Sequence, residues 1–301
     1  MPSLRLQRLL AIGSLFYAAS LWGVVWYPYR LLHESGVGGI ASSFFSYAVP
    51  LILFGWLHLR ELRRSRSKWL WLVVLGLAAG WTNLAYVLGV LQGEVVRVLL
   101  LFYLSPLWTV VFSRILLGEK LNRAGVMIMA LSLGGAMVML WRPEGGLPLP
   151  TNRGEWLGLS AGVMFALSNV IARHLSGVSE GSKAVSIWLG VSVLTLVGLL
   201  LYPAELDFVE HAGLDIWALL LAIGIAIGSM TYAVQYGLAR VPANQAIVIF
   251  LFELVVAAVA AYFLSSERMG LQEWVGAIMI IAASLFSGHM EDEQLKEKAH
   301  V

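Results

Sequence analysis

The chain of 301 residues contains no cysteine, which excludes disulfides, thiolate metal sites and cysteine nucleophiles. Charged residues are also scarce. They make up 13% of the chain, whereas a soluble domain carries about 25%. Because 59% of the residues are apolar, the chain has too little polar surface to cover itself in water. We therefore expect a protein embedded in the lipid bilayer. The net charge of +2 gives no argument for a nucleic-acid partner.

Sequence motifs for catalysis and nucleotide binding are missing as well. The six histidines are scattered, and no phosphate-binding Gly-x4-Gly-Lys-Ser/Thr motif occurs, so we expect neither a metal nor another cofactor. Residues 177–181 match the Gly-x-Ser-x-Gly elbow of serine hydrolases. That elbow requires a preceding strand and an α/β sheet, whereas these residues fall in a membrane loop. We therefore do not expect an enzyme.

Long apolar segments fill most of the chain. About 20 apolar residues cross the hydrocarbon core as a helix, and ten segments fit that length. They are residues 9–28, 39–59, 69–91, 95–117, 124–141, 154–173, 184–202, 214–238, 243–264 and 271–288. Arg5 and Arg8 before the first segment resemble a signal peptide. That segment is longer than usual and has a counterpart in the second half, so we expect it to be retained. The fold class predicted is an all-α integral membrane protein.

The cations are distributed unevenly between the two sides of a ten-span arrangement. One side carries only five of the 20 Lys and Arg residues, namely Arg30, Arg97, Arg142, Arg153 and Arg268. The other side holds the rest, including all the lysines, and both termini. The positive-inside rule makes that side cytoplasmic. We expect a bacterial cytoplasmic (inner) membrane protein with both termini in the cytoplasm.

The second half of the chain repeats the first at an offset of 148 residues. The matching positions are Gly76/Gly224, Ala78/Ala226, Gly80/Gly228, Ala85/Ala233, Gly89/Gly237, Phe102/Phe250, Val111/Val259 and Glu119/Glu267. Each half holds five spans, so the second copy must enter the membrane from the opposite side. This predicts an inverted 5+5 repeat over residues 1–145 and 146–288, followed by a polar cytoplasmic tail at 289–301. Such repeats place substrate near the bilayer centre at their interface.

Polar and aromatic side chains recur on the spans that would form this centre. Amide, hydroxyl and carboxyl groups are costly in hydrocarbon, so they indicate the protein interior. Packing in the core and contact with substrate both remain open for each of them. The candidate substrate-binding residues are Tyr17, Trp22, Tyr47, Asn83, Tyr86, Tyr103, Ser105, Trp108, Ser168, Asn169, Tyr232, Gln235 and Glu253.

Glu253 is the one carboxylate near the middle of a span, and its repeat partner is Ser105. A carboxylate at that depth is expected to face the interior or water. Three roles remain open: a proton-coupling carboxyl, a ligand for a substrate amine, or a structural hydrogen-bonding centre.

Three further features have both a packing and a functional interpretation. The first is the pair of glycines four residues apart in each half, Gly76 with Gly80 and Gly224 with Gly228. Such a pair allows close approach of helices in lipid, and it could equally form a seam along which helices move. The second is Pro106, which predicts a bend in the fourth span. The bend either faces the central cavity or is a distortion that the helix packing tolerates. Arg97 is either a side chain reaching the interface or a contact for a carboxylate near the outer mouth, with Glu94 close enough to neutralise it.

The ten-span inverted repeat resembles the drug/metabolite transporter superfamily, most closely its EamA-type repeats. The sequences that carry the resemblance are Leu-Gly-Glu-Lys-Leu at 117–121, Ser-Ser-Glu-Arg at 265–268 with Gly276 following, and Trp22-Gly23. Gly125 follows Glu119 sooner than the family pattern implies. The resemblance covers nearly the whole chain and implies a metabolite transporter. YddG-like amino-acid exporters are one subgroup, and no motif selects it. Glu119 and Glu267 correspond to signature residues, and their place at loop edges favours helix capping.

These features together predict a secondary transporter whose halves rock around a central cavity. An exporter of an amino acid, or of another small amphipathic or cationic compound, fits the aromatic walls. A passive channel is one alternative, and a membrane-embedded enzyme is another. The expected partners are a small-molecule substrate, the lipid bilayer and protons as coupling ions. The sequence leaves monomer and dimer open.

Overall fold

The computed structural model describes residues 4–141, 149–264 and 270–290, and in this part of the chain the regular structure is helical throughout. Ten helical segments are long and apolar enough to cross a membrane, as predicted. Leu200, Leu214 and Leu271 are more than 70% exposed, which fits helices that face lipid. The chain is therefore an all-α, multi-pass membrane protein.

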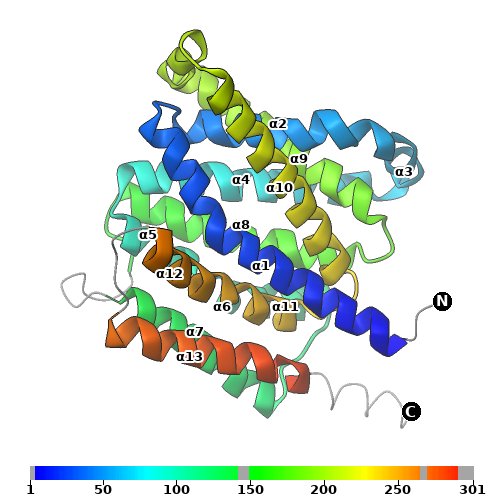
Figure 1. Cartoon of the computed structure of the whole chain (residues 1–301). Coiled ribbons are helices and arrows are strands. Elements are labelled where there is room, and N and C mark those ends of the chain that lie inside the picture. Colours follow the sequence, from blue (N-terminus) through cyan, green and yellow to red (C-terminus); the bar gives the residue numbers. More distant parts are fainter. Residues whose placement is uncertain (1–3, 142–148, 265–269, 291–301) are drawn as a thin grey trace.

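The first half of the chain forms five spans (Figure 1). The first and third are single helices, α1 (Leu4–Glu34) and α4 (Trp69–Gln92). Between them, α2 (Gly39–Phe54) continues through η1 (Gly55–His58), α3 (Leu59–Arg64) and η2 (Arg66–Lys68). The fourth span is divided into α5 (Val95–Phe102) and α6 (Ser105–Leu116), and α7 (Arg123–Leu140) is the fifth. The predicted segments are matched, although α1 begins earlier and ends later than residues 9–28.

The second half repeats this order of elements. It comprises α8 (Arg153–His174), α9 (Glu180–Leu201), η4 (Pro203–Glu210) and α10 (Leu214–Leu238). The ninth span is again divided, into α11 (Ala243–Phe250) and α12 (Phe252–Leu264), and α13 (Leu271–Phe286) leads into η5 (Ser287–Met290). Residues 265–268 with Glu267, the segment 142–148 and the tail from 291 lie outside the described residues.

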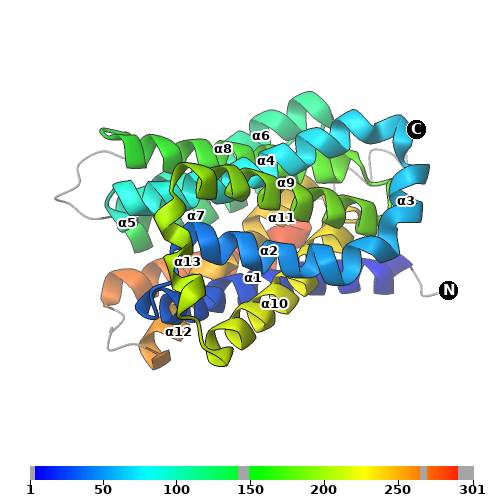
Figure 2. The ribbon, with the colours of Figure 1, turned by 90° about the horizontal axis from the view of Figure 1, so that it is seen from above.

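Helices of the two halves pack on each other rather than among themselves. In one group, α1 and α2 contact α10, and α1 also contacts α12. In the other, α8 and α9 contact α4, and α8 also contacts α5 and α6. The two groups meet where α2 packs against α9. Figure 2 shows these groups as a lower and an upper layer. Each contact in one group has its repeat-related mate in the other, as a pseudo-two-fold axis predicts.

Close approach between the helices depends on glycine. A methyl group at Gly190 on α9 would overlap the Gly76 carbonyl on α4, and one at Gly80 would meet the Gly190 carbonyl. In the other group, Gly224 lies against Val49 on α2. The small residues predicted from the sequence therefore do serve helix packing in lipid. A separate pair, α7 and α13, closes one edge of the molecule (Figure 1).

Candidate functional site

The fourth and ninth spans are interrupted at equivalent places in the repeat. The helix breaks at Tyr103 and Leu104 between α5 and α6, and at Leu251 between α11 and α12. Pro106 has no amide hydrogen to donate to the Phe102 carbonyl, and this carbonyl points at Gly162 on α8. The bend predicted at Pro106 is thus a local interruption of the α-helix over Tyr103 and Leu104. The break at Leu251 has no proline, so the sequence pattern missed it.

Tyr103 and Glu253 meet where these two breaks face each other. The Tyr103 hydroxyl donates a hydrogen bond to Oε1 of Glu253. Tyr86 on α4 lies close enough to interact electrostatically with the same carboxyl, and with Tyr103. All three side chains are half-buried. The breaks therefore bring a carboxyl and two phenols together at a partly accessible place within the membrane.

Aromatic rings surround this group, which we call the Glu253 cluster (Tyr86, Tyr103 and Glu253). Phe102 packs edge-on against Tyr86 and Tyr103, with centroids 5.5 and 5.2 Å apart. On the side of α12, Phe252 packs edge-on against Phe16 of α1 at 5.2 Å. Ring faces attract cations, and apolar walls strengthen electrostatic contacts. The cluster is chemically suited to an amine or an aromatic compound.

A second polar group lies one helical turn away along α4. Asn83 is three residues before Tyr86 and lies within reach of Tyr47 on α2. Three buried atoms, Oδ1 of Asn83, Oγ of Ser46 on α2 and Nε1 of Trp188 on α9, make no hydrogen bond with the described residues. Buried polar atoms in native proteins are nearly always paired. These atoms are therefore candidates for contact with a polar ligand.

Three further candidates from the sequence analysis lie on α8 and α10. Asn169 on α8 and Gln235 on α10 are buried and each has an atom without a hydrogen-bond partner in the described part of the chain. Ser168 donates to the carbonyl of Phe165 in its own helix.

Five others are held by packing or stand apart from the Glu253 cluster. Trp22 packs beside Tyr47, and Ser105 is fully buried next to the break. Trp108 is half-buried on α6. Tyr17 is exposed and hydrogen-bonded to Ser229, and Tyr232 is exposed with its ring tilted against that of His58. A role in substrate binding stays a prediction for all of them.

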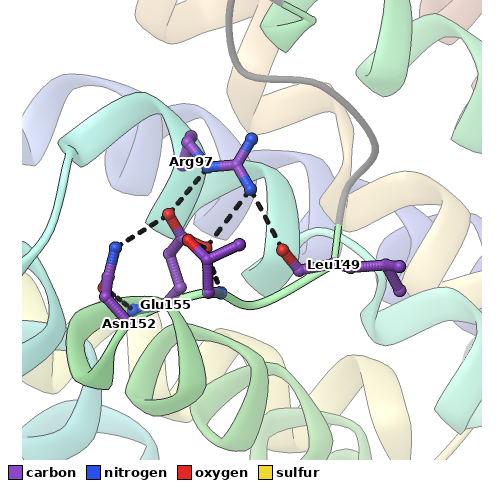
Figure 3. A network of polar contacts seen from close by, with 5 residues as sticks. Arg97, Leu149, Asn152 and Glu155 are labelled. Carbon is purple, nitrogen blue, oxygen red and sulfur yellow. Dashed lines mark hydrogen bonds and ion pairs between the residues drawn. The ribbon is translucent and has the colours of Figure 1, made fainter.

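Arg97 pairs with Glu155, a residue that the sequence analysis missed (Figure 3). Nε of Arg97 donates to Oε1 of Glu155 at 2.7 Å, and Nη2 donates to Oε2 at 3.2 Å. Glu155 also accepts from the Thr151 amide, and its own amide donates to Oδ1 of Asn152. Asn152 is thus the N-cap of α8, and Glu155 reaches back to the amide of Thr151, the residue before that cap, in a variant of the capping box. The spacing of an Asn and a Glu three residues later was the available signal.

Glu119 caps a helix of the other half, which confirms the role expected for it. Its carboxylate accepts from the backbone amides of Ala243 and Asn244 at the start of α11, at 3.2 and 3.4 Å. Ser113 on α6 donates to Asn244 at 3.2 Å. Negative charge at a helix N-terminus is favourable. This contact joins the two helix groups at the end of the bundle opposite Arg97.

The sequence profile of the EamA-like transporter family matches the chain twice, over residues 9–141 and 152–288. A riboflavin transporter of Rhizobium johnstonii is 26% identical over 93% of this chain and 90% of its own length. An uncharacterised transporter of Archaeoglobus fulgidus is 27% identical over 68% of this chain and 72% of its own. A solved crystal structure superposes with a TM-score of 0.73 at 19% identity, covering 95% of this chain and 98% of that one.

These matches define a class of membrane transporters. The chain belongs to the EamA-like transporter family, as the sequence resemblance to the drug/metabolite transporter superfamily implied. The solved structure shows that the fold is shared. A small-molecule substrate and contact with lipid follow from membership of a transporter family with spanning helices.

Proposed function

We propose that this protein is a secondary transporter that exports a small amphipathic or cationic metabolite, such as an amino acid, by alternating access. The observation that carries the proposal is the Tyr103–Glu253 hydrogen bond at two facing helix breaks. In transporters with inverted repeats, interrupted helices typically form the substrate and ion sites near the bilayer midplane. A carboxyl at that depth is energetically costly, so its presence points to a function.

Glu253 binds the substrate amine in one step of the cycle and a proton in another. The two cations compete for one carboxylate, so binding of a proton releases the substrate, and flux is coupled to the pH gradient. Tyr103 and Tyr86 orient the carboxyl, and the neighbouring rings favour an aromatic or organic cation. Asn83 and Tyr47 are proposed to contact the polar part of the substrate.

The moving bodies are the two mixed helix groups and not the two sequence halves. Each half contributes helices to both groups, so the halves cannot move apart without breaking every major helix contact. Polar contacts join the groups at the end of the bundle that holds α3. Besides Glu119 with Asn244, they include Ser179 donating to Glu61 at 2.8 Å, Arg240 pairing with Glu180 at 2.7 Å and Arg173 donating to the Ala239 carbonyl at 2.7 Å. Opening this end requires these contacts to break.

The protein is placed in the bacterial cytoplasmic membrane with both termini inside, from the distribution of cations. In the structure, α1 begins and η5 ends at the same end of the bundle, where α3 also lies (Figure 1). The closed end described above is then the cytoplasmic end. The functional repeats are residues 1–145 and 146–288, with 289–301 as a cytoplasmic tail.

A counterflow screen in proteoliposomes tests this function. Proteoliposomes containing the purified protein would be loaded with an unlabelled compound. Uptake of the labelled compound would then be measured for amino acids, organic cations, nucleosides and riboflavin, with and without a pH gradient. Saturable exchange of a cationic or amphipathic class, accelerated by a gradient, is the expected result. Non-saturable flux would identify a channel instead, and a chemically altered product would identify an enzyme. Exchange that requires no amine on the substrate would overturn the role given to Glu253.

A further inference from the structure

Residues 56–69, which link α2 to α4, form a surface of positive charge that the transport cycle does not use. We call them the cationic segment. Five cations lie on it, and all are exposed: Arg60, Arg63, Arg64, Arg66 and Lys68. Among the residues that the structure describes, none of the five side chains has a hydrogen-bond or ion-pair partner. Positions 60, 63 and 64 share one face of α3, as residues three and four apart do on a helix.

The single acid of the cationic segment does not neutralise this face. Glu61 is engaged by groups outside the cations: its Oε2 faces Nδ1 of His58 at 3.1 Å and accepts from Ser179 at the start of α9 at 2.8 Å. The next carboxylate along that edge, Glu180, is paired with Arg240. The exposed side of the cationic segment therefore carries positive charge that no neighbouring carboxylate neutralises in the described part of the chain.

Exposed apolar side chains flank the cations at both ends of the segment. Trp56 is 65% exposed and Trp69 is 55% exposed, and Leu57 and Leu59 are also exposed. Trp56 donates its indole hydrogen to the Leu53 carbonyl, which fixes the ring at the end of α2. Tryptophan at span ends typically lies at the level of the lipid headgroups. The cations thus lie at the depth of the headgroup phosphates.

The geometry points to a binding site on the cationic segment for the headgroups of anionic phospholipids. Clusters of four to eight Lys and Arg residues directly beyond a spanning helix attract anionic lipids, at about 1 kcal/mol for each cation near the surface. The positive-inside rule by itself requires positive charge at this end of the spans, but it does not require the cations to share one face of a helix. Here helical structure, inward pairing of Glu61 and apolar anchors together leave the phosphate-facing side free. The acyl chains lie along Trp56 and Trp69.

Lipid binding to protein purified in neutral detergent tests this site. Native mass spectrometry would count bound phosphatidylglycerol or phosphatidylcholine, and thermal unfolding would be followed with each lipid. Phosphatidylglycerol is expected to bind and stabilise, and phosphatidylcholine is not. The triple variant R63Q/R64Q/R66Q should bind phosphatidylglycerol on the order of 100-fold more weakly. The triple variant R63K/R64K/R66K, which retains the charge, should bind it nearly as well as the natural chain.

A matched control removes three exposed cations from other places at the same end of the bundle, as R5Q/R114Q/R123Q. This control should keep the stabilisation by phosphatidylglycerol. Equal loss in both glutamine triples would show a non-specific effect of net charge and overturn the proposal. Equal stabilisation by millimolar inorganic phosphate would assign the site to a free anion instead, and so would also overturn it. Melting without lipid shows whether each variant is folded.

Discussion

The hydroxyl of Tyr103 is hydrogen-bonded to the carboxyl of Glu253, although the two residues are 150 positions apart in the chain. Each stands at or beside the break in a spanning helix, and the two breaks correspond in the internal repeat. The bond connects the two mixed helix groups, because α5 belongs to one and α12 to the other. A ligand that competes with Tyr103 for this carboxyl therefore acts on the contact between the groups.

Replacing Glu253 with Gln is expected to abolish pH-driven flux. The amide keeps the size of the side chain and still accepts a hydrogen bond from Tyr103, but it cannot exchange a proton. Counterflow with and without a pH gradient would measure the change. Glu94→Gln removes an exposed loop carboxyl and should leave the pH response intact. Unchanged pH dependence in a folded Glu253→Gln protein would discard the coupling role.

Arg97→Gln is expected to lower stability by about 3–5 kcal/mol, because Glu155 is only 1% exposed and would lose its cation. The double variant R97Q/E155Q should recover part of that loss, since no unpaired charge remains. Thermal unfolding in detergent would compare them. Breaking the exposed pair with Arg30→Gln should cost less than about 1 kcal/mol, because Arg30 is 51% exposed. Equal losses at positions 97 and 30 would contradict the structure.

Gly190→Ala is expected to destabilise the contact between α4 and α9 by about 1–3 kcal/mol, because its methyl group would overlap the Gly76 carbonyl. The matched variant is Gly13→Ala in α1, where a methyl group meets nothing within 4 Å. That change should leave the melting temperature unchanged or raise it, since alanine favours helix over glycine. If both substitutions had the same effect, the close approach at Gly190 would be wrong.

Glu119→Ala is expected to open the end of the bundle that holds α3, because α11 loses its cap and the groups lose a contact. Because the chain has no native cysteine, a single introduced cysteine is the only thiol that a maleimide can label. Ala246→Cys on α11 is fully buried, so it should react with a maleimide faster after Glu119→Ala. The control is Glu34→Ala, which removes an exposed carboxylate from the end of α1. Equal rates in both backgrounds would rule out Glu119 as part of the closure.

The sequence by itself determined the lipid environment, the ten spans, the repeat and the family. Each of these depends on composition, segment length or self-similarity, which are local or additive properties. Glu253 could be selected because a lone carboxylate in an apolar span is conspicuous. Glu119 could be assigned a cap because it stands at a loop edge.

Only the tertiary structure decided which residues meet. Nothing in the sequence relates Tyr103 to Glu253 in preference to other tyrosines, since the pairing depends on how two interrupted helices cross. The break at Leu251 has no proline to announce it, and the partner of Arg97 lies on another helix. The direction of the Tyr232 side chain also depends on its neighbours. The side chain is exposed, and its ring contacts that of His58. In lipid, apolar composition is alike on all helix faces, so periodicity cannot choose partners. Backbone approach at glycines and paired polar atoms do so.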